Sequence, residues 1–184
     1  MKPSGMAAKY KKIKALILDV DGVLTDGLLY FSDAGESFKA FNVQDGLGIA
    51  VWRSAGYKVF IITGRKSRIV KRRADDLQID GVFQGVGNKL EALKLICRQH
   101  ELNLQELAYV GDDLNDLSAL LCCGVSLAPR QAVPEVKNRV DHVLARAGGS
   151  GAVREAIELI LKKKGTWDKV LEHFETGPEE RTGK

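Results

Sequence analysis

The chain has 184 residues, of which 45% are hydrophobic and 28% are charged, as in an ordinary globular protein. This length allows one domain with a full core and is too short for two comfortable ones. The net charge of +4 is mild and the basic residues are scattered, so a nucleic-acid partner is not expected. Neither is a membrane, because no signal peptide and no apolar stretch of roughly 18 residues is found.

Short apolar runs alternate with amphipathic segments from one end of the chain to the other. Six runs predict strands, which are Ala15–Val20, Lys58–Thr63, Gly81–Gln84, Leu107–Val110, Val125–Leu127 and His142–Leu144. Apolar residues at three- and four-residue steps predict helices between them, at Gly46–Ala55, Lys66–Leu77, Asn88–His100 and Gly151–Lys163. This alternation predicts an α/β fold, with a mostly parallel sheet and helices on both of its faces.

One aromatic-rich region after the first strand interrupts the alternation. Leu28–Phe31 and Ser37–Phe41 flank Ser32–Gly35, whose residue types favour a turn. This pattern predicts a β-hairpin that projects from the sheet. Its apolar side chains would expose a large hydrophobic area on a monomer, which argues against a ribbon that stays free in solution.

The first strand delivers two carboxylates, Asp19 and Asp21, into a turn that contains Gly22. Two like charges held this close are costly unless a cation or a shared proton compensates them. Oxygen ligands of this kind suit a hard cation such as Mg²⁺, which binds one or two carboxylates together with a phosphate. Considered alone, the motif is better explained as an acidic turn after a strand, and only the rest of the chain can overturn that interpretation.

Three further polar groups lie where later strands end. Thr63 is followed by Gly64 and Arg65, Lys89 opens a helix, and the run Asp112–Asp116 follows the strand that ends at Val110. Each has an ordinary explanation, as a helix cap, a surface lysine or an acidic first turn of a helix. Ligands of open parallel sheets bind at the carboxyl ends of the strands, so four such groups together predict one site there.

Phosphoryl transfer through a covalent aspartyl phosphate would use all of these groups. One carboxylate attacks phosphorus, and a carboxyl group two residues later protonates the leaving alcohol and then activates water. Mg²⁺ offsets the repulsion between carboxylate and phosphate. A hydroxyl, a lysine and backbone amides hold the phosphoryl oxygens on which charge develops.

The order Asp-x-Asp-Gly, Thr-Gly-Arg, Lys and Gly-Asp-Asp-x-x-Asp resembles the haloacid dehalogenase superfamily of phosphatases, from Ala15 to about Val125. The resemblance implies a Rossmann-like three-layer fold. It also implies roles for single residues. Asp19 would be the nucleophile, Asp21 the general acid and base, and Thr63 and Lys89 the groups that clamp the phosphate. Mg²⁺ would bind to Asp19, to Asp112 and to Asp21, the last through its backbone carbonyl, while Asp113 or Asp116 would orient the site.

Larger relatives in this superfamily carry a cap domain in one of two insertions. About 40 residues separate Asp21 from Thr63, and 25 separate Thr63 from Lys89, so neither gap holds an independent domain. We therefore expect no cap domain. An open site of this kind needs a large substrate or a neighbouring subunit to close it.

The segments Asp19–Gly27, Lys39–Ile49 and Gly148–Glu155 resemble one cap-less branch, the 3-deoxy-D-manno-octulosonate 8-phosphate phosphatases of bacterial lipopolysaccharide synthesis. This resemblance runs from about Ile13 to Leu161. It implies a homotetramer in which hairpins surround a central barrel and an adjacent subunit completes each active site at the subunit interface. The glycine-rich Ala147–Gly151 is either a flexible entry to the last helix or, as the resemblance implies, a segment that reaches near a neighbour's active site. The resemblance places a sugar-acid phosphate against Asp21, Asn42, Val43, Gln44, Asp45, Gly46, Arg65, Arg73 and Lys89.

One departure weakens the substrate assignment and leaves the chemistry intact. Many members of the branch carry a substrate-facing arginine where this chain has Ala50, although Arg53 lies one turn later. A related nonulosonate 9-phosphate phosphatase is therefore an alternative. A phospho-receiver domain is another, but its acidic pair would follow the first strand and its phosphorylated Asp would come later. A non-catalytic scaffold is the third, against which the four intact motifs argue.

These motifs also divide the chain. We expect a flexible N-terminus over residues 1–12, a phosphatase domain over residues 13–164, and a short helix and disordered tail over residues 165–184. Cys97, Cys122 and Cys123 have neither a disulfide-type nor a metal-type spacing, and each lies in an apolar helical pattern. The reducing cytoplasm is the compartment that fits best.

Overall fold

The computed structural model describes residues 3–33 and 35–176 of the chain. A six-stranded parallel sheet lies at its centre, in the order β5-β4-β1-β6-β7-β8. Its strands are β1 (Ala15–Leu18), β4 (Lys58–Thr63), β5 (Gly81–Gln84), β6 (Leu107–Val110), β7 (Val125–Ala128) and β8 (His142–Val143). The predicted α/β class and all six predicted strands are confirmed.

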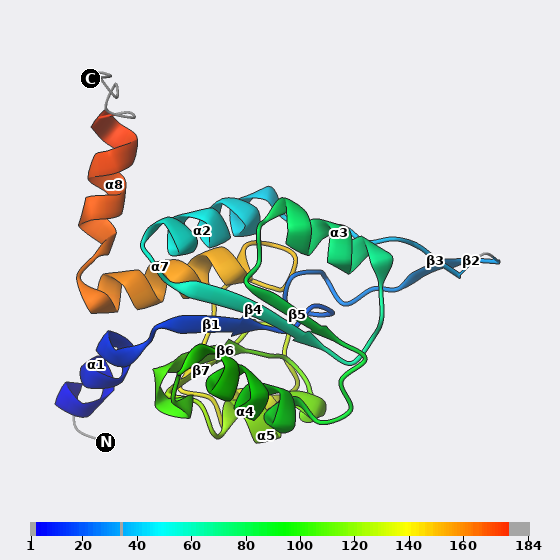
Figure 1. Ribbon diagram of the computed structural model, residues 1–184, viewed down its shortest axis with the longest axis horizontal. Coiled ribbons are helices and arrows are strands. Elements are labelled where there is room, and N and C mark those ends of the chain that lie inside the picture. The colour runs from blue at the N-terminus through cyan, green and yellow to red at the C-terminus, as the bar shows by residue number, and fades with distance from the viewer. Residues whose placement is uncertain (1–2, 34, 177–184) are drawn as a thin grey trace.

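Helices cover both faces of the sheet, as Figure 1 shows. One face carries α2 (Val43–Ser54), α3 (Arg68–Asp76) and α7 (Ala152–Lys164), and the other carries α4 (Lys89–His100) and α5 (Leu117–Leu120). Along β1, Leu16 and Leu18 pack into the first layer whereas Ile17 packs into the second, because side chains of a strand alternate between its faces. The short helix α6 (Pro134–Lys137) lies between β7 and β8, and 3₁₀ turns at Leu104–Glu106 and Leu114–Asp116 flank β6.

Strand β1 ends two residues earlier than predicted, at Leu18 instead of Val20. The carbonyl of Val20 accepts hydrogen bonds from the backbone amides of Val23, Leu24 and Thr25, at 3.2, 2.9 and 3.0 Å. The chain therefore folds back into a tight turn directly after Asp19. This turn holds both carboxylates of the acidic pair at the carboxyl edge of the sheet.

Two predicted helices differ slightly at their starts, and side-chain caps explain where these two and α4 begin. Helix α2 starts at Val43 instead of Gly46 because the Asn42 side chain accepts a hydrogen bond from the Gln44 amide at 2.7 Å. Helix α3 starts at Arg68 because Ser67 accepts one from Val70 at 3.2 Å. Asn88 caps α4 and Lys89 opens it, as predicted.

The predicted hairpin is confirmed as β2 (Tyr30–Ser32) and β3 (Gly35–Phe38), which extend away from the main sheet (Figure 1). Tyr30 and Phe38 stack with ring centroids 4.2 Å apart. Four large apolar side chains in or beside the hairpin are at least 42% exposed, namely Leu28, Leu29, Phe31 and Phe38. Exposed apolar side chains gathered on one ribbon are typical of an interaction surface.

The two ends of the described chain carry helices. Residues Pro3–Lys12 form α1, where the sequence predicts a flexible segment; tertiary packing orders it, since Tyr10 is 2% exposed in the core. Helix α8 (Trp167–Thr176) matches the predicted short helix and includes Glu175 and Thr176, with which the polar composition of the chain end predicts that the disordered tail begins. Residues 177–184, the rest of that tail, lie outside the described residues, and the division into residues 13–164 and 165–184 stays a prediction. Among the described helices, none has the length and apolar character of a bilayer span.

Candidate active site

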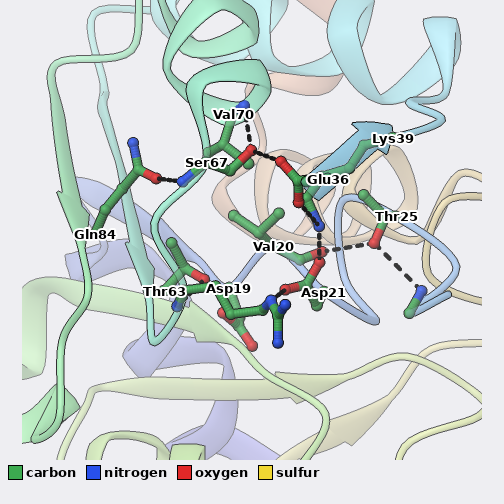
Figure 2. Close-up of polar contacts among 12 residues, drawn as sticks. Asp19, Val20, Asp21, Thr25, Glu36, Lys39, Thr63, Ser67, Val70 and Gln84 are labelled. Carbon is green, nitrogen blue, oxygen red and sulfur yellow. Dashed lines mark hydrogen bonds and ion pairs between the residues drawn. The ribbon is translucent and has the colours of Figure 1, made fainter. Parts of the chain in front are cut away.

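The carboxyl ends of three neighbouring strands bring the predicted polar groups to one edge of the sheet. Asp19 follows β1, Thr63 ends β4, and Asp112 follows β6, while Lys89 enters from the first turn of α4. Figure 2 shows Asp19, Asp21 and Thr63 at the ends of β1 and β4. Strand β1 lies between β4 and β6, so the groups converge where the order of the strands reverses.

Lys89 is the central cation of the site. Its side chain is 2% exposed, and its Nζ lies 2.9 Å from Asp19 Oδ2 and 2.7 Å from Asp116 Oδ1. Burial alone would lower the pKa of Lys89, but the charges of Asp19 and Asp116 outweigh burial and raise it. The ammonium group is therefore held in its charged form at the edge of the sheet.

Asp116 organises this site from a fully buried position. Its Oδ1 also accepts a hydrogen bond from the Tyr109 hydroxyl at 2.8 Å. Its Oδ2 accepts the backbone amides of Asp112 and Asp113, at 3.1 and 3.3 Å. Asp116, and not the exposed Asp113, thus orients both Lys89 and the loop that carries Asp112.

The pKa values of the Asp19 and Asp112 carboxyl groups are raised into the neutral pH range. Burial, with the nearby charge of Asp116, raises the pKa of Asp19 to about 7, although Lys89 partly opposes this. Burial, with the charges of Asp19 and Asp116, likewise raises the pKa of Asp112 to about 7. Burial is the larger cause of both shifts, and the neighbouring carboxylate charges, which Lys89 only partly offsets, add to it. A divalent cation bound there would favour the charged form of both groups.

The donor set fits such a cation. One oxygen each from Asp19, Asp112 and Asp116 lies within 4.8 Å of the others. All three are hard ligands of the type that Mg²⁺ prefers. Gly22 makes room for this arrangement, since a Cβ there would lie 2.0 Å from Asp112 Oδ2, and its φ of +86° is in the region that favours glycine.

Asp21 does not join that carboxylate cluster through its side chain. Its Oδ1 accepts a hydrogen bond from Lys39 Nζ at 2.5 Å, and its Oδ2 lies 3.9 Å from Arg65 Nε. Figure 2 shows Asp21 and Lys39 beside Asp19, with Glu36 on the other side of Lys39. The side chain of Asp21 is 21% exposed and so is accessible to a substrate.

The predicted substrate segment, residues 42–46, proves to be the cap and first turn of α2. Val43 is 81% exposed, and Gln44 accepts a hydrogen bond from Arg146 at 2.7 Å. Asp45 faces the other way: it is 1% exposed, and its Oδ1 accepts the Arg154 amide at the start of α7 at 2.8 Å. A buried carboxylate at a helix N-terminus is a structural link, so the prediction that Asp45 contacts substrate is corrected.

Arg73 is more enclosed than an arginine on a solvated helix face would be. Its guanidinium lies 5.7 Å from the ring centre of Phe41, and its Nη2 occupies the space where Gly46 would otherwise carry a Cβ, 2.7 Å away. Its Nε is buried and has no hydrogen-bond partner among the described residues. Arg65, by contrast, is exposed and lies 5.7 Å from the ring centre of Phe31 in the hairpin.

The glycine-rich run Ala147–Gly151 packs on the acidic turn of its own chain. The Gly149 amide donates to the Val23 carbonyl at 3.1 Å. Gln131 bridges the two segments, because its side chain donates to the Gly22 carbonyl at 2.6 Å and accepts the Gly148 amide at 2.9 Å. The run is thus a support for the turn after Asp21.

Comparison with known proteins identifies the family of this chain. A model of haloacid dehalogenase-like hydrolases matches residues 81–157. The 3-deoxy-D-manno-octulosonate 8-phosphate phosphatase of Haemophilus influenzae is 44% identical over 160 residues, which are 87% of this chain and 89% of that protein. The chain belongs to this phosphatase family. It is accordingly a hydrolase, built without a separate cap domain in the residues that the structure describes.

Solved structures of the family superpose closely on this chain. The phosphatase from Moraxella catarrhalis, in complex with a magnesium ion, a phosphate ion and 3-deoxy-D-manno-octulosonate (KDO), has a TM-score of 0.90 at 38% identity, covering 94% of this chain and 99% of that one. The cobalt-bound Haemophilus influenzae enzyme has a TM-score of 0.83 at 44% identity, covering 85% and 92%. The predicted fold and family are confirmed by these likenesses.

Several contributors to the site were not predicted from sequence. They are linked to it by hydrogen bonds and are Lys39, Glu36, Ser67, Tyr109 and Gln131. A lysine after a strand or a tyrosine inside one has no local signature that distinguishes it from a surface or core residue. Ala50, where many members of the branch carry an arginine, lies on the exposed side of α2 and lines a groove with Phe174 of α8.

Proposed function

We propose that this phosphatase hydrolyses 3-deoxy-D-manno-octulosonate 8-phosphate to KDO and phosphate through an aspartyl-phosphate intermediate. The observation that carries the proposal is the buried Lys89–Asp19 pair, 2.9 Å apart, beside Thr63 and Asp112 at the carboxyl edge of the sheet. A lysine that holds one carboxylate oxygen leaves the other free to attack phosphorus. The substrate in this proposal is taken from the names of the related phosphatases.

In the first step, Asp19 Oδ1 forms a bond to phosphorus while the bond from phosphorus to the C8 oxygen breaks. Asp21, in its protonated form, gives its proton to that departing oxygen. In the second step, Asp21 takes a proton from water, the water oxygen bonds to phosphorus, and the carboxylate of Asp19 is released. Thr63 and Lys89 hold the phosphoryl oxygens while negative charge builds on them.

We assign Mg²⁺ to the carboxylates of Asp19 and Asp112, with the backbone carbonyl of Asp21 as a further ligand. When bound, the ion supplies positive charge that offsets the repulsion between Asp19 and the phosphate. Both oxygens of Asp116 already accept hydrogen bonds, from Lys89 and Tyr109 and from two backbone amides. Asp116 therefore serves the site by holding Lys89 and the Asp112 loop in place.

The sugar acid would lie above the phosphate, against the mouth of the site. Arg65 is exposed there, and its planar fork can bind a carboxylate with two hydrogen bonds. Asn42, Val43, Gln44, Gly46 and Arg73 are the remaining predicted contacts from α2 and α3. A nonulosonate 9-phosphate is the alternative substrate, which Ala50 favours because this branch usually carries an arginine at that position.

We further propose that the enzyme is a cytoplasmic homotetramer that works in lipopolysaccharide synthesis. The supporting observation is the apolar surface of the hairpin, where Phe31 and Phe38 are 59% and 53% exposed. Burial of each aromatic ring between subunits would contribute about 1.5–3 kcal/mol, which a free monomer forfeits. A neighbouring subunit would also close a site that has no cap domain.

The decisive experiment measures phosphate release from a panel of sugar phosphates, with Mg²⁺ or with a chelator. We expect KDO 8-phosphate to be the preferred substrate, activity to vanish with the chelator, and Asp19→Asn to be folded and inactive. A preference for a nonulosonate 9-phosphate would move the assignment to that alternative. Activity of Asp19→Asn near the wild-type level would refute the covalent mechanism.

A further inference from the structure

A short series of charged side chains connects the hairpin to Asp21 (Figure 2). Lys39 directly follows the last residue of β3, and its side chain is 2% exposed. Its Nζ lies 2.5 Å from Asp21 Oδ1 and 3.2 Å from Glu36 Oε1. An ammonium group from the base of the hairpin is thus held out of water between two carboxylates.

At the hairpin end of this series of charges, hydrogen bonds connect Glu36 to the main body of the protein. Glu36 accepts a hydrogen bond from the Ser67 hydroxyl, which itself caps α3. The Ser67 amide donates to the Gln84 side chain at the end of β5, at 2.6 Å. Burial alone would raise the pKa of Glu36, but the hydrogen bonds from Ser67 and Lys39 hold it below its ordinary value, so Glu36 stays charged opposite Lys39.

The Asp21 end has one close donor. Arg65 Nε, at 3.9 Å from Asp21 Oδ2, is beyond hydrogen-bond distance, so the described hydrogen bond to this carboxylate comes from Lys39 alone. A general acid must point its proton at the leaving oxygen within about 3 Å.

We propose that Lys39 is the positioning residue of Asp21, and that the fastening of the hairpin to α3 sets the direction of the Asp21 carboxyl group. This inference rests on the acid and base role of Asp21 given above. It assigns the hairpin a part within its own subunit, in addition to any contact with other subunits.

A comparison of two leaving groups separates positioning from general damage. An alkyl phosphate such as KDO 8-phosphate or glucose 6-phosphate needs a proton on its leaving oxygen, whereas 4-nitrophenolate leaves 4-nitrophenyl phosphate without one. In Lys39→Met we expect kcat on the alkyl phosphates to fall about 10- to 100-fold, with KM changed less than about threefold. The first turnover of 4-nitrophenyl phosphate, followed by rapid mixing, should slow less than about threefold, because only later water attack needs Asp21.

Matched variants complete the test. Lys39→Arg keeps the charge and should recover most of the alkyl-phosphate rate. Lys71→Met removes a lysine that pairs with Asp75 on the exposed face of α3, and should leave both rates unchanged. If Lys39→Met does not fold, Glu36→Gln replaces it, with a smaller loss confined to alkyl phosphates.

Equal losses on both substrate types, or no loss at all, would overturn the role of Lys39. Asp21→Asn distinguishes this failure from a failure of the proposed function. If Asp21→Asn also shows no dependence on the leaving group, the acid role of Asp21 is wrong. If Asp21→Asn slows alkyl phosphates selectively and the Lys39 and Glu36 variants do not, the positioning inference alone is wrong.

Discussion

Replacing Asp116 by Asn tests whether this buried carboxylate holds the site together. The side chain is 0% exposed and accepts four hydrogen bonds, from Lys89, Tyr109 and the amides of Asp112 and Asp113. An Asn side chain keeps one acceptor oxygen and turns an NH₂ donor toward the other pair of donors. Two donors would therefore lose their acceptor, and Lys89 would keep Asp19 as its single carboxylate partner among those described.

The expected cost follows from these contacts. A buried donor without an acceptor costs about 1–3 kcal/mol, and breaking a buried charge pair costs about 3–5 kcal/mol. Because Asp19 still neutralises Lys89, we expect Asp116→Asn to lower the free energy of unfolding by about 3–5 kcal/mol in total. That is a large part of the roughly 5–15 kcal/mol that stabilises a typical domain.

Urea unfolding at pH 7 in the presence of a chelator measures this loss directly. Asp113→Asn is the matched control, since Asp113 is exposed in the same turn and Asn also caps helices well. Its effect should stay within about 0.5 kcal/mol. A loss below about 1 kcal/mol in Asp116→Asn, or an equal loss in Asp113→Asn, would refute the organising role of Asp116.

Three further outcomes are expected. Because the pKa values of Asp19 and Asp112 are both raised to about 7, the folded protein keeps protons that the unfolded chain releases from about pH 4. The melting temperature of the metal-free protein should therefore fall as pH rises from about 4 to about 7, and Mg²⁺ should restore it most above pH 7; a melting temperature independent of pH would contradict this. Gly22→Ala places a Cβ 2.0 Å from Asp112 Oδ2, so it should abolish both activity and the Mg²⁺-dependent rise in melting temperature, and an unchanged rise would disprove the close contact. Phe31→Ser combined with Phe38→Ser should lower the mass measured by light scattering, whereas an unaltered assembly would exclude the hairpin from the interface.

Local patterns predicted most of the secondary structure. Strands such as Lys58–Thr63 and Gly81–Gln84 were predicted residue by residue, because fully or partly buried strands of a parallel sheet are continuous apolar runs between turn residues. The Asn88 cap of α4 also has a local signature. The boundaries that differed, at β1, α2 and α3, depend on hydrogen bonds from turns and caps that compete with the periodic signal.

The site was predictable in part for a topological reason. Once a parallel sheet is inferred, strand ends must share an edge, so the convergence of Asp19, Thr63 and Asp112 follows from their positions in the chain. The direction in which a side chain points at that edge does not follow from its position in the chain. Asp45, which the resemblance placed on the substrate, turns instead toward the N-terminus of α7, more than one hundred residues later in the chain.

The amino-acid sequence alone thus determined the fold class and the family, and it predicted the chemistry proposed for the carboxyl edge of the sheet, since these depend on periodicity and on the residues that end each strand. Tertiary structure decided which carboxylates hold Lys89, which cation holds Asp21, and where the hairpin is fastened. Those contacts join residues far apart in the chain, such as Lys89 with Asp116 and Glu36 with Ser67. Their partners are selected by packing in three dimensions, for which a linear pattern carries no signal.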